Sequence, residues 1–343
     1  MDSVAALELL GRAPTVHIAT TLPNGNPLLR TVHAVVVDGF LAFHGAPAGE
    51  KTEALGRTAV VCAEEVIAEI PSYFIDPERA CPATTYYLSV QAHGILAEVD
   101  DLDFKTRVLA ALMRKFQPEG GHVPLDPTHQ LYRNVIEQIL IVRMPLDRID
   151  GKAKLGQNRS AEQLLYVLEA LWKRGLPGDP RAIDLVRQAN EKVPAPAFLA
   201  FPEGLIAYCA LDPAAIDEVV ALLADSYWNV DVPREVVKQS HLHADAWIGA
   251  RDQEGNLVAS ARAVSDYSKV AWIYDVIVAP EWRSRGIGKA LMKLMLDHPT
   301  VRHVRNVRLA TKDAQGLYYK FGFVDMDDSA VNFPNTSMIL RRT

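Results

Sequence analysis

The fold of the last third of the chain is decided by Val276-Ile-Val-Ala-Pro-Glu-Trp-Arg283-Ser-Arg-Gly286-Ile-Gly288-Lys-Ala-Leu291. This stretch reads as a β-strand, a short loop with two glycines and the start of an amphipathic helix. Free backbone N–H groups at a helix N-terminus bind anions, and the helix dipole favours negative charge there. Gly286 and Gly288 leave room for phosphate oxygens, and Arg283 and Arg285 add positive charge. The pattern therefore predicts a pyrophosphate site.

Other interpretations of the two glycines are weighed against this one. A P-loop is excluded because no Gly-Lys-Ser/Thr sequence closes the loop. A Rossmann dinucleotide loop is compatible with the glycine pair, but the third glycine and the acidic residue on the next strand are absent. An ordinary strand–helix turn looks the same, so the loop alone leaves that alternative open.

The surrounding sequence adds a family resemblance. Arg283-x-x-Gly286-x-Gly288 matches the Arg/Gln-x-x-Gly-x-Gly/Ala signature of GNAT acyltransferases. Three further segments stand in that family's order: Ser226-Tyr-Trp228, Ala261-Arg-Ala-Val-Ser-Asp266 and Thr311-Lys-Asp-Ala-Gln-Gly-Leu-Tyr-Tyr-Lys-Phe-Gly-Phe323. From about Leu205 to Thr343, the chain therefore resembles an acetyl-CoA-dependent N-acetyltransferase, whose amine substrate attacks the thioester directly.

The resemblance implies roles for particular residues. Tyr318 stands where the family often keeps the tyrosine that protonates the leaving thiolate, a task that suits a phenol. Tyr319 is expected to face another side of the helix. Asp275 is the candidate general base or substrate contact, and Asp266 is a weaker one. The residues expected to bind acetyl-CoA are Val276, Ile277, Val278, Arg283, Arg285, Gly286, Ile287, Gly288 and Lys289.

Each of these assignments has a structural alternative. Tyr318 and Tyr319 are also compatible with core packing under the helix. Asp275 and Asp266 are also compatible with strand-end carboxylates that accept backbone N–H groups. His241 and His243 precede a strand, and we expect both at the surface.

The first hundred residues read as closely spaced strands and turns. Asp38-Gly39 is a strong hairpin signal between Val35-Val-Val37 and Phe40-Leu-Ala-Phe43. Further strands are expected at residues 58–63, 86–93 and 95–99. Several short strands at this spacing predict a small antiparallel barrel.

A second constellation lies within these strands. Phe43-His-Gly45-Ala-Pro-Ala-Gly49-Glu-Lys51 is a glycine-flanked loop that ends in a lysine, and such a loop can hold a phosphate. A hairpin loop with a solvated lysine would look the same. Together with Tyr87-x-Ser89-Val and Gly151-Lys-Ala-Lys154-Leu-Gly-Gln-Asn, however, it resembles the pyridoxamine-phosphate-oxidase-like split barrels of the Nim-like and PaiB-like types.

This second resemblance implies an FMN-binding barrel that forms a homodimer with flavin at the interface. The residues expected near the FMN phosphate are His44, Gly45 and Lys51. Those expected to flank the ring or ribityl chain are Arg30, Thr31 and His33, with Ser89 and Gln91 as weaker candidates.

The sequence thus predicts an α+β and α/β protein of two domains. A split β-barrel with a helical tail is expected over residues 1–195, and a GNAT domain over residues 205–343. The proline-rich segment 196–204 is the expected linker.

Net charge, cysteine content and hydropathy limit the classes of function that the sequence is compatible with. The 343 residues have a net charge of −6, which argues against non-specific nucleic-acid binding. Cys62, Cys81 and Cys209 are few, odd in number and far apart, which suggests a reducing cytosol and no structural metal. The N-terminus lacks the features of a signal peptide, and no apolar run reaches the length of a membrane span. We therefore expect a cytoplasmic enzyme that acetylates a small amine.

Two rival functions stay open from the sequence. One is a flavin-binding regulator or sensor of the PaiB-like type, although no helix-turn-helix is evident. The other is a flavin oxidoreductase with an accessory transferase domain.

Overall fold

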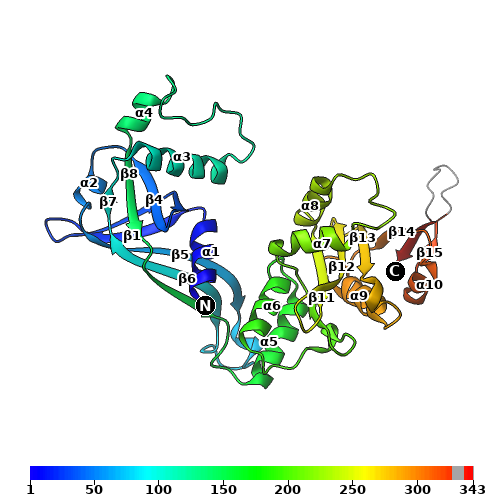
Figure 1. The fold of residues 1–343 in the computed structure, drawn as a ribbon. Helices are drawn as coiled ribbons and strands as arrows, with labels where there is room; N and C mark the ends of the chain where they lie inside the picture. The colour runs from blue at the N-terminus through cyan, green and yellow to red at the C-terminus, as the bar shows by residue number, and fades with distance from the viewer. Residues whose placement is uncertain (327–335, 343) are drawn as a thin grey trace. The chain divides into compact units, whose positions relative to one another are not determined.

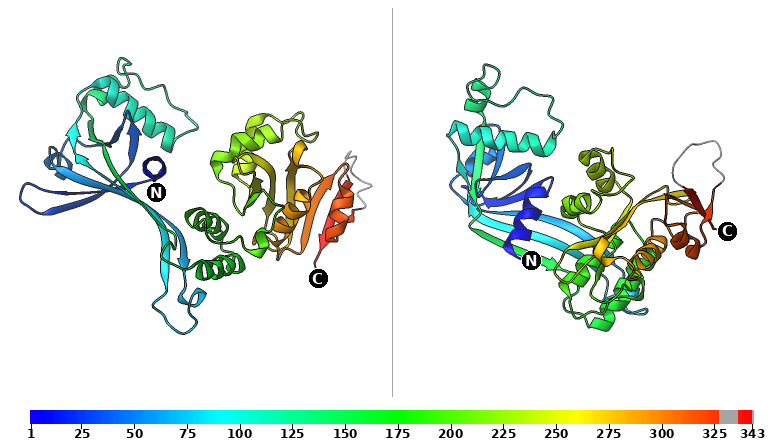
Figure 2. Two further views of the ribbon diagram at one scale, coloured as in Figure 1. Left: turned by 60° about the horizontal axis from the view of Figure 1, so that its bottom comes forward. Right: turned by 45° about the vertical axis from the view of Figure 1, so that its right-hand side comes forward.

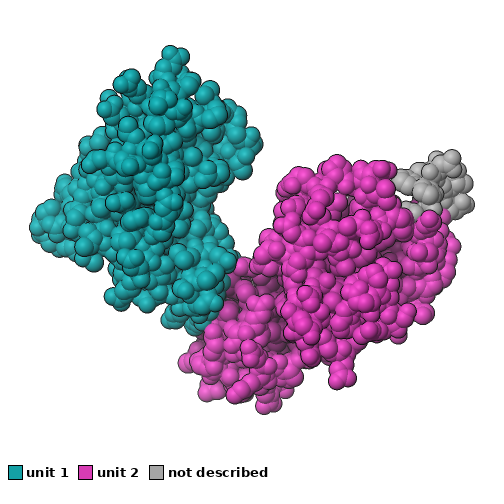
Figure 3. All heavy atoms as spheres, viewed as in Figure 1, with its two compact units in different colours: residues 1–66, 85–154 teal, residues 67–84, 155–343 magenta. Residues whose placement is uncertain are grey.

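The computed structural model describes residues 1–326 and 336–342 (Figures 1 and 2). The chain divides into two compact units (Figure 3). Unit 1 contains residues 1–66 and 85–154, and unit 2 contains residues 67–84 and 155–343. No helix among the described residues has the length and apolar composition needed to cross a membrane. A cytoplasmic location stays a prediction.

Unit 1 is built on two sheets, a five-stranded one in the order β2-β1-β5-β6-β9 and a four-stranded one in the order β3-β4-β8-β7. The strands are β1 (Val16–Thr21), β2 (Pro27–Val32), β3 (Ala34–Val37), β4 (Phe40–Gly45), β5 (Thr58–Ile70), β6 (Thr84–Ile95), β7 (Ala97–Glu98), β8 (Leu140–Pro145) and β9 (Arg148–Lys154). The helices are α1 (Ser3–Arg12), α2 (Glu50–Glu53), α3 (Leu102–Phe116) and α4 (Arg133–Gln138).

The predicted hairpin between β3 and β4 is present. Asp38 and Gly39 have φ angles of 50° and 79°, and Val37 pairs with Phe40 directly across the turn. Two positive φ values in succession are what a type I′ turn needs. Helix α3 then packs against this hairpin and β8, burying Val35, Val108 and Ile141 in one core.

Unit 2 is built on a seven-stranded sheet in the order β10-β11-β12-β13-β14-β16-β15. The strands are β10 (Ile206–Tyr208), β11 (Ala246–Arg251), β12 (Leu257–Ser265), β13 (Val270–Val278), β14 (Asn306–Thr311), β15 (Val324–Asp325) and β16 (Thr336–Arg341). The helices are α5 (Ala161–Arg174), α6 (Asp179–Ala189), α7 (Ile216–Leu222), α8 (Arg234–Leu242), α9 (Ile287–Asp297) and α10 (Gln315–Tyr318).

The central strands of this sheet are covered by helices. Helix α7, with Val237 of α8, packs on Trp247 and Ile277. Helix α9 packs on β11, β12 and β13. Five successive residues at the start of β12 are all buried, as expected for a strand covered on both faces.

The helical tail that the sequence assigned to the barrel belongs to unit 2. On α5, the Trp172 indole N–H donates to Asp297 at 2.7 Å, and its ring stacks on Phe198 with centroids 4.5 Å apart. Arg302 donates to the carbonyl of Trp172 at 2.7 Å. Within the expected linker, residues 196–204, Leu199 is buried. The predicted domain limits therefore differ from the structure, because the proline-rich segment packs with the helices that precede it.

Candidate active site

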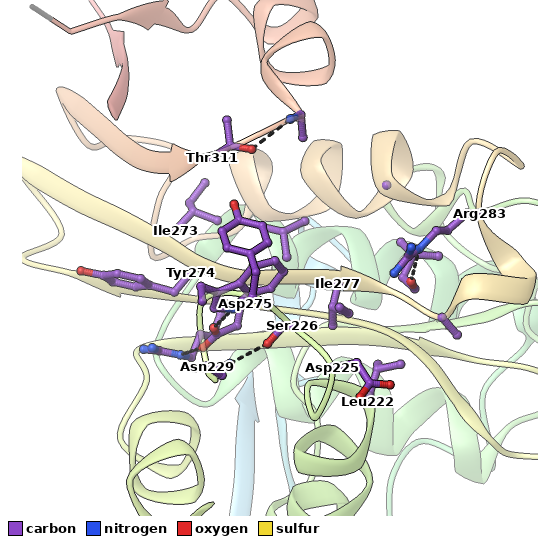
Figure 4. Close-up of a pocket in the computed structure, with 18 of the residues that line it drawn as sticks. Leu222, Asp225, Ser226, Asn229, Ile273, Tyr274, Asp275, Ile277, Arg283 and Thr311 are labelled. Carbon is purple, nitrogen blue, oxygen red and sulfur yellow. Dashed lines mark hydrogen bonds and ion pairs between the residues drawn. The ribbon is translucent and has the colours of Figure 1, made fainter. Parts of the chain in front are cut away.

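Unit 2 contains a cleft of about 1450 Å³ where β13 and β14 separate (Figure 4). The two strands pair in parallel only from Val270–Trp272 to Asn306–Arg308. Beyond Trp272, β13 has no partner on β14, so its backbone N–H and C=O groups on that side face the cleft. An unpaired strand edge of this kind can bind an extended, amide-containing ligand.

A β-bulge lies in the middle of β13. The register with β12 shifts so that Arg262 pairs with Tyr274 and Ser260 pairs with Ile277. Asp275 takes a φ of 53° at this point. Bulges re-aim side chains next to active sites, and a non-glycine residue at positive φ marks a position that its surroundings hold in place.

One end of the cleft is the N-terminus of α9. Gly286 caps the helix with a φ of 82°, and the first helical bond runs from Ala290 N–H to its carbonyl. In the described residues, the N–H groups of residues 287–289 have no protein acceptor. A Cβ atom added to Gly288 would meet only Leu317, at 3.6 Å, so the space above this turn is open. This end can accept a phosphate group.

The predicted cofactor residues separate into two groups here. Arg283, Gly286, Ile287 and Gly288 line the cleft, as do Val276, Ile277 and Val278 of β13. The Arg283 Nε donates to the Val278 carbonyl at 3.1 Å, which holds its side chain along the strand end. Arg285 and Lys289 are exposed and do not line the cleft, and the Arg285 guanidinium instead lies 4.7 Å over the Trp282 ring.

Asp275 lies at the other end of the cleft from Arg283 (Figure 4). Its side chain is 7% exposed. The Trp228 indole N–H donates to its Oδ1 at 2.8 Å, and the Arg262 Nε donates to its Oδ2 at 2.6 Å. Each carboxylate oxygen therefore already has a donor. Neither partner was identified from the sequence, although Trp228 ends one of the segments that carry the family resemblance.

Asp266, the weaker candidate, is placed elsewhere. Its Oδ1 accepts the N–H groups of Ser268, Lys269 and Val270, and it does not line the cleft. Asp266 is therefore a strand-end carboxylate that accepts backbone N–H groups, and it stabilises the turn between β12 and β13.

Tyr318 lines the cleft and Tyr319 does not. Tyr318 is 6% exposed and its ring packs on Phe323. Burial, followed by the effects of Tyr227 and Asp313, raises the pKa of Tyr318 to about 12. The neighbouring Tyr319 is 49% exposed, and its hydroxyl donates to Asp325 at 2.9 Å. The two tyrosines therefore face different surroundings, as expected.

Aromatic side chains line the part of the cleft around Asp275. The Trp272 and Tyr274 rings stack at 5.9 Å, and the Tyr227 and Trp228 rings meet edge to face at 4.8 Å. Tyr227 and Tyr274 are each more than a third exposed. Sequence reasoning missed this set, because its members come from two elements that only the fold brings together.

His241 corrects the sequence analysis. It was expected at the surface, but its side chain is fully buried. It lies near the end of α8 and faces the sheet, where its ring meets Trp247 edge to face at 5.5 Å. His243 is exposed, as expected.

In unit 1 the structure gathers most of the predicted phosphate residues. A Cβ atom on Gly45 would lie 3.5 Å from Lys51 Nζ, so the lysine side chain crosses the backbone at Gly45. Partial burial lowers the pKa of His44, and the nearby charges of Lys51 and His33 lower it further. The Arg30 guanidinium pairs with Glu50, next to Lys51 in the chain. The structure therefore brings Lys51, Gly45 and His44 together, and the charge of Arg30 is balanced there by Glu50.

The remaining predicted residues of unit 1 have other partners. Thr31 bonds to the His17 ring at 3.2 Å. Ser89 and Gln91 lie on β6 and pair with Lys152 and Asp150 of β9. Within the described part of the chain, no hydrogen bond or ion pair joins Ser89 or Gln91 to Lys51 or His44.

Family models match the chain in two places. Residues 2–153 match the family described as pyridoxamine 5'-phosphate oxidase. Residues 216–323 match the acetyltransferase (GNAT) family.

Individual relatives match the C-terminal part. GCN5-related N-acetyltransferase 2, chloroplastic, of Arabidopsis thaliana is 37% identical over 76 residues, which is 22% of this chain and 30% of that protein. Serotonin N-acetyltransferase 2, chloroplastic, of Oryza sativa subsp. japonica is 31% identical over 128 residues, 35% of this chain and 60% of that protein. A solved structure from Xanthomonas campestris, of a protein belonging to the GNAT family, is 34% identical with a TM-score of 0.34, covering 38% of this chain and 91% of that one. The chain thus spans less than two thirds of these two plant proteins.

Proposed function

Because residues 2–153 belong to the pyridoxamine 5'-phosphate oxidase family and residues 216–323 to the GNAT acetyltransferase family, we propose that this protein is an acetyl-CoA-dependent N-acetyltransferase of a small amine with a second, FMN-binding domain. The observation that carries the proposal is the cleft between β13 and β14, which runs from Asp275 to the free N–H groups of α9.

The two ends of the cleft support this reaction in different ways: one would bind the cofactor's phosphates, and the other would hold the reacting groups. The pyrophosphate of acetyl-CoA would bind the N–H groups of residues 287–289, and its pantetheine amides would pair with the open edge of β13. The thioester would then lie near the bulge. The amine nitrogen bonds to the thioester carbonyl carbon as the C–S bond breaks, and the amine loses a proton.

Tyr318 would give its hydroxyl proton to the departing thiolate. Its pKa of about 12 keeps the phenol protonated at physiological pH, so a proton is always present for donation. No nucleophilic side chain is needed, because the amine attacks the thioester itself.

The acceptor would carry an aromatic group. Tyr227 and Tyr274 line the cleft beside the bulge, where the amine must lie, and each is more than a third exposed. An aryl acceptor would take the place of Lys312 or Arg262 over the faces of these rings. Stacking on such faces contributes about 0.5–1.5 kcal/mol per ring pair.

We expect kcat/KM for 2-phenylethylamine to exceed that for n-butylamine by about tenfold, because only the aryl amine can stack on these rings. Thiol release from acetyl-CoA measures both rates. Tyr274→Ala should remove most of the preference. Equal rates for aryl and alkyl amines would reject the aromatic acceptor, and no thiol release with any amine would reject the transferase.

Unit 1 would hold FMN by its phosphate. The residues present fit this group, since the Lys51 side chain lies against the Gly45 backbone, where an added side chain would touch it, and His44 is close enough to feel the charge of Lys51. FMN, when bound, supplies hydride or electron transfer. This chain's residues would bind and orient it.

Lys51→Ala is expected to weaken FMN binding about 10- to 100-fold, because a charge-assisted hydrogen bond contributes roughly 1.5–3 kcal/mol. Quenching of flavin fluorescence on titration with protein measures the affinity. Lys173→Ala, on exposed surface of the other unit, is the matched control and should bind as the wild type does. Equal affinity of both variants would exclude Lys51 from the site.

The proposed assembly of unit 1 is a homodimer. Strands β2, β9, β3 and β7 are the edges of its two sheets, and unpaired edges are commonly covered by a second chain. The mass in solution, measured by light scattering, tests this.

A further inference from the structure

Helix α8 places one buried ionisable side chain directly behind Asp275. The His241 Nε2 lies 3.7 Å from Asp275 Oδ2. The His241 Nδ1 lies 2.9 Å from the Val237 carbonyl oxygen, and a carbonyl can only accept. Nδ1 therefore carries the hydrogen of the neutral ring, and Nε2 presents a lone pair. Among the described residues, no group donates a hydrogen bond to that nitrogen.

The charged and titratable groups around His241 do not donate a hydrogen bond to its Nε2 in the described residues. On the sheet side these are Asp275 of β13 and Arg262 of β12, which are already bonded to each other. On the other side His241 borders a cavity of about 170 Å³ with Asp245 and His298.

Three titratable groups lie across that cavity: Asp245, His298 and Cys209. Burial raises the pKa of the Cys209 thiol well above its usual value, so this group stays neutral. The other two already have hydrogen-bond partners. Asp245 accepts bonds from Ser265 N–H and the Tyr267 hydroxyl. His298 accepts from Thr300 N–H and donates to the Cys209 carbonyl. Burial lowers the pKa of His298 to about 3, so this ring is neutral and offers no proton to His241.

The reaction needs a place for one proton. An alkylamine is mostly an ammonium ion at neutral pH, and it must lose a proton before its nitrogen can attack. Asp275 lines the cleft but already accepts two hydrogen bonds, from Trp228 and Arg262. A proton added to either oxygen would have to share it with one of these two donors or displace that donor. The neighbouring His241 Nε2, which has no donor of its own among the described residues, is the place to which the proton can move on.

We propose that His241 is a positioning residue that acts through Asp275: the ammonium N–H bond breaks toward the Asp275 carboxylate, and the His241 Nε2 takes up the proton to form an imidazolium–carboxylate pair. The proton leaves to solvent after the amide product departs. This inference rests on the proposed acetyl transfer. Burial lowers the pKa of His241, which keeps its ring unprotonated and ready at neutral pH.

This role of His241 predicts that kcat falls as the pH is lowered. Acidification of the enzyme–substrate complex protonates His241 before the reaction, so kcat falls on the acid side with the imidazole titration. His241→Gln can still donate to the Val237 carbonyl but cannot take up a proton. We expect kcat at neutral pH to fall about tenfold and the acid limb to move or disappear.

The test compares kcat–pH profiles at saturating acceptor for the wild type, His241→Gln and Trp228→Phe. Trp228→Phe removes the other neighbour of Asp275 without removing a titrating group, so it should lower kcat while the acid limb stays in place. Unchanged acetyl-CoA affinity by calorimetry shows that a variant is folded. A His241→Gln profile that overlays the wild type would overturn the proposal.

A second measurement does not depend on turnover. Nitrogen NMR of ¹⁵N-histidine-labelled wild type should show His241 as the Nδ1–H tautomer at neutral pH, with Nε2 protonating on acidification. An Nε2–H tautomer would overturn the inference even if acetyl transfer is confirmed. Absence of thiol release by the wild type would reject the proposed function, and the inference with it, whatever the tautomer.

Discussion

Gly288→Glu is expected to raise the dissociation constant for acetyl-CoA by about 100-fold or more, because a carboxylate at this position repels the phosphates and occupies the space that they need. The substitution places a carboxylate beside the N–H groups of residues 287–289, where the pyrophosphate would lie. It also fills the open space above Gly288. Isothermal titration calorimetry with acetyl-CoA measures the change.

Gly288→Ala is the matched control. An added Cβ would meet only the Leu317 side chain, at an ordinary contact distance of 3.6 Å, so alanine should bind acetyl-CoA within a few-fold of the wild type. Unchanged affinity in a folded Gly288→Glu protein would falsify the pyrophosphate site. Equal losses for both variants would instead indicate that the helix start had been distorted.

Tyr318→Phe is expected to lower the rate of acetyl transfer about 10²–10⁴-fold, the usual contribution of a general acid. Phenylalanine keeps the ring and its packing on Phe323, so the affinity for acetyl-CoA should barely change. Single-turnover measurements with the best acceptor amine isolate the chemical step from product release.

Tyr319→Phe is the control for this position. It removes a hydroxyl that bonds only to the exposed carboxylate of Asp325 and does not reach the cleft, so turnover should stay near the wild-type rate. Near-full turnover by Tyr318→Phe would make Tyr318 a packing residue and leave protonation of the thiolate to water.

The parts of the fold that were predictable are those encoded locally. The hairpin at Asp38-Gly39 and the helix that starts after Gly286 depend on backbone conformations that few residues adopt, so a short stretch specifies each. The cleft residues of β13 follow from the same stretch.

The surroundings of residues whose partners are distant in the sequence could not be predicted from short sequence stretches. His241 was expected at the surface because it precedes a strand, and its partner Asp275 belongs to another element. Arg285 and Lys289 were assigned by their charge, whereas the direction of each side chain depends on the turn geometry. The segment at residues 196–204 was read as a linker from its prolines, but Leu199 packs into unit 2.

The division of the chain into two interleaved units limits how recombination can separate them. The backbone passes between the units three times, after residues 66, 84 and 154. A single recombination breakpoint therefore cannot transfer either unit whole. A gene fragment that begins at residue 155 would lack residues 67–84, and one that ends at residue 154 would carry residues 67–84 without the rest of their unit. The two units should accordingly be inherited together, and the function of one is expected to be lost by substitution within the chain more readily than by deletion.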